Sequence, residues 1–117
     1  MGVTVLIVDD HEVFRTSARA LLESEGFLVV AEAATGAEAL EAAAAVRPDI
    51  VLLDIQLPDI DGLVVAERLA ATTRPPTVVL ISSREAASYG PRLSESPARG
   101  FIAKGILSGE AISSLVG

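Results

Sequence analysis

Five short, mainly apolar runs, four of them followed at once by a polar or charged residue, constrain this chain more than any other feature. The first run, Val3 to Val8, is rich in β-branched residues and stops at Asp9-Asp10. Consecutive apolar positions over so few residues are typical of a strand buried on both faces of a sheet. Four later runs have the same form and predict four more strands: Leu28 to Ala33, Ile50 to Leu53 before Asp54, Thr77 to Ile81 before Ser82, and Gly100 to Ala103 before Lys104.

Apolar residues at helical spacing lie between most of these runs. The first predicted helix ends at Gly26, and its apolar face consists of Phe14, Ala18, Leu21 and Leu22. Three more helices are predicted, over Gly36 to Val46, around the stripe Gly62, Val65, Ala66 and Leu69, and over Ser108 to Val116.

The interval Glu85 to Arg99 differs from the others. Gly90-Pro91 and Pro97 interrupt it, and proline inside a helix removes a backbone donor and clashes with the preceding turn. We therefore expect one or two short helical turns there instead of a long helix.

Strands that alternate with helices predict a parallel sheet joined by right-handed crossovers. The expected fold is a doubly wound α/β domain over residues 1–117, with helices on both faces of a five-stranded sheet in the flavodoxin-like strand order 2-1-3-4-5. In such sheets the functional site lies beyond the carboxyl ends of the strands. That edge collects Asp9, Asp10, Asp54, Ser82 and Lys104.

Composition excludes several classes of protein. The formal net charge is −7, and the only lysine is Lys104, so direct nucleic-acid binding by this segment is not expected. No apolar stretch is long enough to cross a membrane. The absence of cysteine excludes disulfides and thiolate metal sites and fits a cytoplasmic location.

The residues at the strand ends favour phosphoryl chemistry. Three carboxylates at one edge repel each other unless a cation offsets their charge, and an oxygen-lined site suits Mg²⁺. A carboxylate such as Asp54 can accept a phosphoryl group, with Lys104 offsetting charge and Ser82 donating a hydrogen bond.

Other α/β chemistries fit this sequence poorly. No glycine-rich phosphate loop follows the first strand, which argues against dinucleotide or nucleotide binding. A flavin site would require neutral donors and aromatic stacking partners near Asp9-Asp10-His11. A hydrolase triad would have His11 as its single candidate base, and no nucleophile elbow is present.

The spaced set of site residues resembles the receiver domains of two-component response regulators. It consists of Asp9-Asp10, Asp54, Leu57-Pro58, Gly62, Ser82 and Lys104. Asp9-Asp10-His11, Phe14-Arg15 and Leu21-Leu22 further resemble the NarL/FixJ subfamily, whose receivers are joined to a LuxR-type helix-turn-helix output domain. Such an output domain is absent from this chain, so we expect the chain to be an excised receiver.

The resemblance implies a role for each site residue. Asp54 would accept a phosphoryl group from a sensor histidine kinase, and Mg²⁺ would bind Asp9, Asp10, Asp54 and the backbone carbonyl of Gln56, with Asp9 acting partly through water. Lys104 and Ser82 would contact the phosphoryl oxygens, and Phe101 would change rotamer. The domain would catalyse only its own phosphotransfer and dephosphorylation, and a homodimer is compatible with the resemblance.

Two other hypotheses stay open. Gly105 stands where many receivers have proline, and with the interrupted Glu85 to Arg99 segment this leaves room for a phosphorylation-independent dimerisation or binding module. A small phosphatase would need an acid or base two residues after Asp54, where this chain has Gln56. His11 is interpreted as polar surface at the start of a helix and not as a metal ligand.

Overall fold

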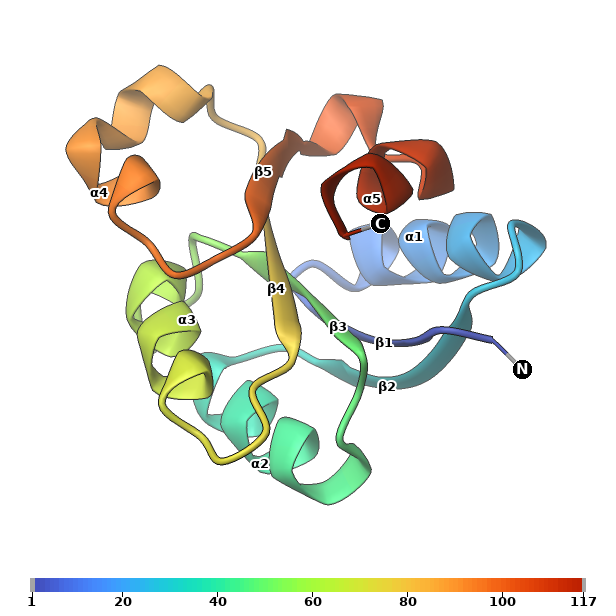
Figure 1. The fold of residues 1–117 in the computed structure, drawn as a ribbon. Coiled ribbons are helices and arrows are strands. Elements are labelled where there is room, and N and C mark those ends of the chain that lie inside the picture. Colours follow the sequence, from blue (N-terminus) through green and yellow to red (C-terminus); the bar gives the residue numbers. More distant parts are fainter. Residues whose placement is uncertain (1, 117) are drawn as a thin grey trace.

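The computed structural model of the protein describes residues 2–116 and contains one five-stranded parallel sheet (Figure 1). The strand order is β2-β1-β3-β4-β5, so the predicted topology is confirmed. The strands are β1 (Thr4–Val8), β2 (Leu28–Ala33), β3 (Ile50–Asp54), β4 (Thr77–Ser82) and β5 (Gly100–Ala103). The helices are α1 (Glu12–Ser24), α2 (Gly36–Val46), α3 (Gly62–Ala70), α4 (Pro91–Ser94) and α5 (Gly109–Val116), with 3₁₀ turns η1 (Ala86–Tyr89) and η2 (Lys104–Ile106).

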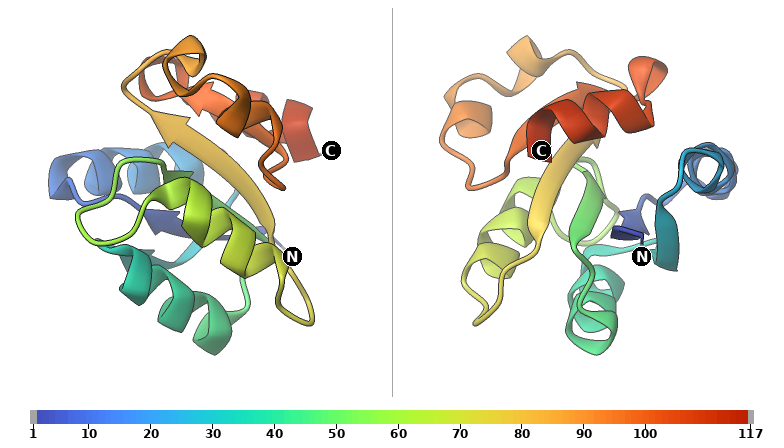
Figure 2. Two further views of the ribbon diagram at one scale, coloured as in Figure 1. Left: turned by 90° about the vertical axis from the view of Figure 1, so that its left-hand side faces the viewer. Right: turned by 45° about the vertical axis from the view of Figure 1, so that its right-hand side comes forward.

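Helices cover both faces of the sheet, with α1 and α5 on one face and α2 and α3 on the other (Figures 1 and 2). Alternate residues of each strand point to opposite faces. In β1, Val5 and Ile7 join the core beneath α1 and α5, whereas Leu6 and Val8 join the core beneath α2 and α3. All four are fully buried, because helices on both sides leave no face of the central strands in contact with solvent.

The segment between β4 and β5 has little regular structure, as the sequence predicts. The 3₁₀ turn η1 and the helix α4 have four residues each, and neither contains a buried residue. Gly90 separates them with φ of 58°, and Pro91 begins α4. In Figure 1 this orange segment projects beside β5 instead of lying flat against the sheet.

Side-chain caps fix the helices that border the carboxyl edge of the sheet. Asp59, in the loop after β3, accepts hydrogen bonds from the backbone N–H groups of Gly36 and Ala37 at the start of α2. Asp61 likewise accepts from Leu63 N at the start of α3. These bonds satisfy donors that a helix leaves unpaired at its first turn, and they hold the loop that follows Asp54.

Two features are absent from the described residues 2–116. None of their helices is both long and apolar enough to cross a membrane. No peptide bond among them is cis, including the bond after Lys104.

Candidate functional site

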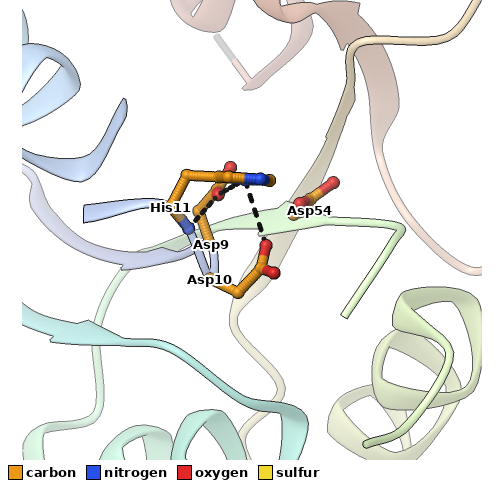
Figure 3. A group of neighbouring side chains, drawn as sticks. All are labelled: Asp9, Asp10, His11 and Asp54. Carbon is orange, nitrogen blue, oxygen red and sulfur yellow. Dashed lines mark hydrogen bonds and ion pairs between the residues drawn. The ribbon is translucent and has the colours of Figure 1, made fainter. Parts of the chain in front are cut away.

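The predicted site residues meet at the carboxyl edge of the sheet. Asp9 follows β1, Asp54 closes β3, Ser82 closes β4 and Lys104 follows β5. Parallel pairing brings these strand ends together, since β3 lies between β1 and β4 and β5 lies beside β4. Figure 3 shows Asp9, Asp10, His11 and Asp54 converging on one small region.

Asp54 is almost completely buried, with 2% of its surface exposed. Its Oδ2 accepts a hydrogen bond from Lys104 Nζ at 3.3 Å, and its Oδ1 accepts one from the backbone N–H of Gln56 at 3.2 Å. Gly62 packs against the backbone of Asp54, where a Cβ atom would collide with the carbonyl oxygen. The fold therefore determines the position of this carboxylate from both its side chain and its backbone.

Burial and charge change the pKa of Asp54. Burial raises the pKa, and the neighbouring Asp9 carboxylate raises it further, while Lys104 and the Gln56 N–H partly oppose these effects. The net direction is upward because burial and the charge of Asp9 together outweigh the attraction of Lys104 and the hydrogen bond from Gln56. Additional positive charge at this place would keep Asp54 ionised.

Lys104 connects two strand ends through its ammonium group. Its Nζ lies 2.6 Å from Asp9 Oδ2 and 3.3 Å from Asp54 Oδ2. It also lies 4.7 Å from the centre of the Phe14 ring, a cation–π distance. Burial alone would lower the pKa of Lys104, but the attraction of Asp9 and Asp54 outweighs it and raises that pKa. The lysine is therefore charged at neutral pH.

Asp10 and His11 complete an acidic cluster at the open side of the site. Ligand atoms of Asp9, Asp10, His11 and Asp54 all lie within 4.8 Å of one another. His11 is 68% exposed and is the N-cap residue of α1, in agreement with its prediction as helix-start surface. That prediction missed its ring contacts, however, because His11 Nδ1 lies 3.0 Å from Asp9 Oδ1 and 3.1 Å from Asp10 Oδ1 (Figure 3).

The donor set of this cluster fits a hard divalent cation. Three carboxylates face a single lysine, so the site carries excess negative charge. Carboxylate and carbonyl oxygens are the ligands that Mg²⁺ prefers. The predicted Gln56 ligand is a backbone carbonyl on a residue whose N–H already bonds Asp54. The role of that carbonyl stays a prediction.

Ser82 closes β4 at this edge, whereas Phe101 lies within β5 beside Leu80, and the two residues make different contacts. Ser82 is fully buried, and its hydroxyl pairs with the hydroxyl of Tyr89 and accepts the N–H of Arg84. Phe101 is half-buried on the edge strand β5, and its ring packs against Tyr89. Neither residue contacts Asp54 through a hydrogen bond within residues 2–116, so their roles in phosphorylation remain predictions.

Three contacts near the site were not expected from the sequence. Arg15 donates from Nη1 to the backbone carbonyl of Asp9 at 2.7 Å, Phe14 lies beneath Lys104, and Tyr89 binds Ser82. Arg15 lies one helical turn after His11, so helical spacing could have placed it near the strand end. No comparable periodicity exists in the irregular segment that carries Tyr89.

Comparison with known proteins then gives the family. A model described as the response regulator receiver domain matches residues 5–115. The chain belongs to this family. The receiver fold and the NarL/FixJ resemblance expected from the sequence are therefore confirmed.

The similar proteins include regulators and isolated receiver domains. The response regulator GacA of Pseudomonas aeruginosa is 36% identical over 104 residues, which are 88% of this chain and 49% of GacA. The signal receiver domain of NarL from Mycobacterium tuberculosis has a TM-score of 0.86 and 35% identity, and the match covers 98% of this chain and 94% of that chain.

A LuxR-family two-component response regulator from an Aurantimonas species has a TM-score of 0.85 and 26% identity. That match covers 97% of this chain and 81% of the other. The receiver domain spans about half the length of the curated relatives it matches.

Proposed function

We propose that this receiver domain accepts a phosphoryl group on Asp54 and that the modified domain controls a DNA-binding transcriptional output. The observation that carries the proposal is the setting of the Asp54 carboxylate, which is buried at the end of β3 beside Lys104 and the acidic side chains of Asp9 and Asp10. A carboxylate can act as a nucleophile toward phosphorus, and catalysis of such a transfer depends mainly on positioning and charge compensation.

In the proposed step, a carboxylate oxygen of Asp54 forms a bond to the phosphorus of a phosphohistidine on a sensor histidine kinase. The phosphorus–nitrogen bond breaks, its electron pair remains on the imidazole nitrogen, and that nitrogen takes a proton from water. Lys104 attracts the phosphoryl oxygens and Ser82 donates a hydrogen bond to them. Later attack by water on phosphorus releases phosphate and restores the Asp54 carboxylate.

Mg²⁺ is the cofactor that this donor set suits. Asp9, Asp10, Asp54 and the Gln56 carbonyl would hold it, with Asp9 acting partly through water. When bound, the ion supplies positive charge that offsets the charge of the phosphoryl oxygens. The excess of carboxylates over ammonium groups at the site supports this assignment.

The output is proposed to lie in another domain, of the LuxR helix-turn-helix type. A net charge of −7 argues against DNA binding by this segment itself, and the LuxR-family regulator from Aurantimonas supports the choice of output. The phosphoryl group carries a charge of about −1.5 to −2 in place of the single carboxylate charge of Asp54 and brings three strong acceptor oxygens, a change that can shift a two-state equilibrium toward an active form. Kinase contact and transcription would take place in the cytoplasm.

The direct test is the intact mass of the domain after incubation with phosphoramidate, with and without Mg²⁺. We expect a Mg²⁺-dependent gain of one phosphoryl group that Asp54→Asn lacks. Glu67→Gln serves as the matched control, because Glu67 is an exposed carboxylate on α3 and its loss should change nothing. If the wild-type domain gains no phosphoryl group while a GacA receiver does in parallel, the phosphorylation-independent module becomes the better hypothesis.

A further inference from the structure

The hydroxyl group of Ser82 is occupied by contacts that do not involve Asp54. Its Oγ lies 2.5 Å from the hydroxyl oxygen of Tyr89 and accepts the backbone N–H of Arg84 at 3.0 Å. A serine hydroxyl has one proton and two acceptor positions, so these two bonds use two of its three hydrogen-bonding positions. Ser82 itself is fully buried, and its hydroxyl cannot exchange these partners for bulk water.

Tyr89 also connects Ser82 to Phe101. The two aromatic rings lie 6.4 Å apart between centroids, at an interplanar angle of 56°, a tilted arrangement that is favourable for an aromatic pair. Tyr89 is half-buried and packs against the core beneath α2 and α3, whereas η1, the turn that carries it, contains no buried residue. The contacts of this single side chain therefore hold η1 to the sheet.

We propose that Tyr89 is a positioning residue, which holds the Ser82 hydroxyl toward η1 in the unphosphorylated domain and releases it when Asp54 is phosphorylated. This inference rests on the proposed function, because it gives Ser82 a second hydrogen-bond partner in the phosphoryl group. Since Tyr89 packs on Phe101, release of the tyrosine hydroxyl also frees η1 and the Phe101 ring to move together.

The competition between these two partners sets the expected effect. Either hydroxyl can be the donor in the bond between Ser82 and Tyr89, and in both directions the bond holds Ser82 Oγ next to the tyrosine oxygen. The bond therefore opposes movement of the Ser82 hydroxyl toward the phosphoryl oxygens and reduces the population that is ready for phosphotransfer. Loss of one neutral hydrogen bond should raise that population by about fivefold, which corresponds to ~1 kcal/mol.

The first arm of the test is a double-mutant cycle. The rate of phosphorylation by phosphoramidate in saturating Mg²⁺ is measured for wild type, Tyr89→Phe, Ser82→Ala and the double variant. We expect Tyr89→Phe to be about fivefold faster than wild type, and to give no acceleration when Ser82 is already alanine. Ser88→Ala is the matched control, since Ser88 is an exposed neighbour in η1 and should leave the rate unchanged.

Equal acceleration by Tyr89→Phe in both backgrounds would mean that the tyrosine acts through packing alone and would overturn the inference. No acceleration in the wild-type background would overturn it as well.

The second arm uses Tyr89 as its own spectroscopic reporter. The chain has one tyrosine and no tryptophan, so its near-ultraviolet absorbance and fluorescence report the environment of this phenol. We expect phosphorylation to shift the wild-type spectrum to that of unphosphorylated Ser82→Ala, and Ser82→Thr to retain the wild-type spectrum. Asp54→Asn should show no shift with the donor.

The two proposals fail in different ways. A wild-type domain that gains the phosphoryl mass while its tyrosine spectrum stays unchanged contradicts the role of Tyr89 and leaves the proposed function intact. A domain that gains no mass contradicts the proposed function, and the role of Tyr89 falls with it.

Discussion

Two parts of this receiver domain are built in opposite ways. From β1 to β4 the chain forms regular elements: Asp59 and Asp61 cap α2 and α3, and the strands β1, β3 and β4 are almost entirely buried. From Arg84 to Arg99 the chain forms one 3₁₀ turn and one short α-helix of four residues each, and neither contains a buried residue. The first part holds the carboxylates of Asp9, Asp10 and Asp54 at fixed positions, and the second part holds Tyr89, the partner of the Ser82 hydroxyl.

This difference indicates a division of labour. Close-packed cores resist displacement, so a carboxylate placed by β3 keeps its geometry. Segments with few buried apolar contacts open at low cost in free energy, so the contacts of Tyr89 can be exchanged without unfolding the sheet. The proposed phosphotransfer needs charges at fixed positions and a hydroxyl that can move. The two parts of the domain together provide both.

The largest expected effect compares one leucine from each part. Leu53 in β3 is fully buried, and Leu53→Ala should lower the free energy of unfolding by about 2–5 kcal/mol because it leaves a cavity in the core. Leu93 in α4 is half-buried at the edge of the same core, and Leu93→Ala should cost less than about 1 kcal/mol. Urea unfolding followed by circular dichroism measures both.

An equal cost for the two leucines would break the comparison, since it would mean that α4 contributes to the core as strongly as β3. Unchanged m-values in both variants are the control that the two proteins still unfold in a two-state manner.

A second pair of variants compares Gly62, which contacts the backbone of Asp54, with Gly105, which follows Lys104. At Gly62 a Cβ would collide with the carbonyl oxygen of Asp54, whereas a Cβ at Gly105 would have no heavy atom of the described residues within 4 Å apart from its chain neighbours. Gly62→Ala should therefore cost about 1–3 kcal/mol or more and slow phosphorylation by displacing Asp54. Gly105→Ala should change the free energy of unfolding and the rate of phosphorylation little. Thermal unfolding and the phosphoramidate assay test the pair, and a strong effect at Gly105 would show that the loop after Lys104 is tightly packed.

The regular part was predictable from sequence because its signals are local and repeated. The run Ile50 to Leu53 and the alanine-rich Gly36 to Val46 each read as one type of element, and the structure places strand and helix there. Boundaries shifted by a residue at β1, β3, β4 and α5, since strand and helix ends depend on hydrogen bonds that no residue type specifies alone. The interrupted segment was also predicted, because a proline such as Pro91 cannot continue a helix without a steric clash with the preceding turn.

The site was predictable only in part. Position at a strand end identified Asp9, Asp54 and Lys104 as neighbours, because parallel strands bring their carboxyl ends together. The ring of His11 between two carboxylates and the bond from Tyr89 to Ser82 were not predicted. These contacts depend on side-chain direction at an N-cap and in an irregular turn, where neither a period of 2 nor one of 3.6 residues applies.

A third, smaller effect concerns the charge that the regular part keeps buried. Burial first, and then Asp9, raises the pKa of Asp54, so ionised Asp54 reduces the stability of the metal-free domain. A raised folded-state pKa contributes stability below the unfolded pKa, and this stability is lost as the pH rises through the folded pKa. Without Mg²⁺ at pH 7, Asp54→Asn should therefore be more stable than wild type, by on the order of 1 kcal/mol after allowance for solvent screening.

Two changes of condition should remove that advantage. At a pH well below the unfolded pKa of about 4 the wild-type carboxyl is protonated in both states, and the two proteins should have equal stability. Added Mg²⁺ should stabilise wild type more than the variant, because an ion that binds only the folded state raises its stability. Thermal unfolding in a chelator, and then across a Mg²⁺ titration, measures both changes. A variant that is less stable than wild type in the chelator would contradict the account of Asp54.

The smallest effect is expected at Asp59, the exposed cap that ties the loop after β3 to α2. Its pKa is lowered by the N–H groups of Ala37 and Gly36, so its contribution to stability is present above the unfolded pKa and is lost as the pH falls through the folded one. The difference in Tm between wild type and Asp59→Asn should be constant near neutral pH and shrink below about pH 4. Glu67→Gln, which removes an exposed carboxylate on α3, is the matched control variant. A difference that instead persists in acid would mean that the amide of asparagine fails to cap α2 for steric reasons, and that the regular part depends on the shape of Asp59 and not on its charge.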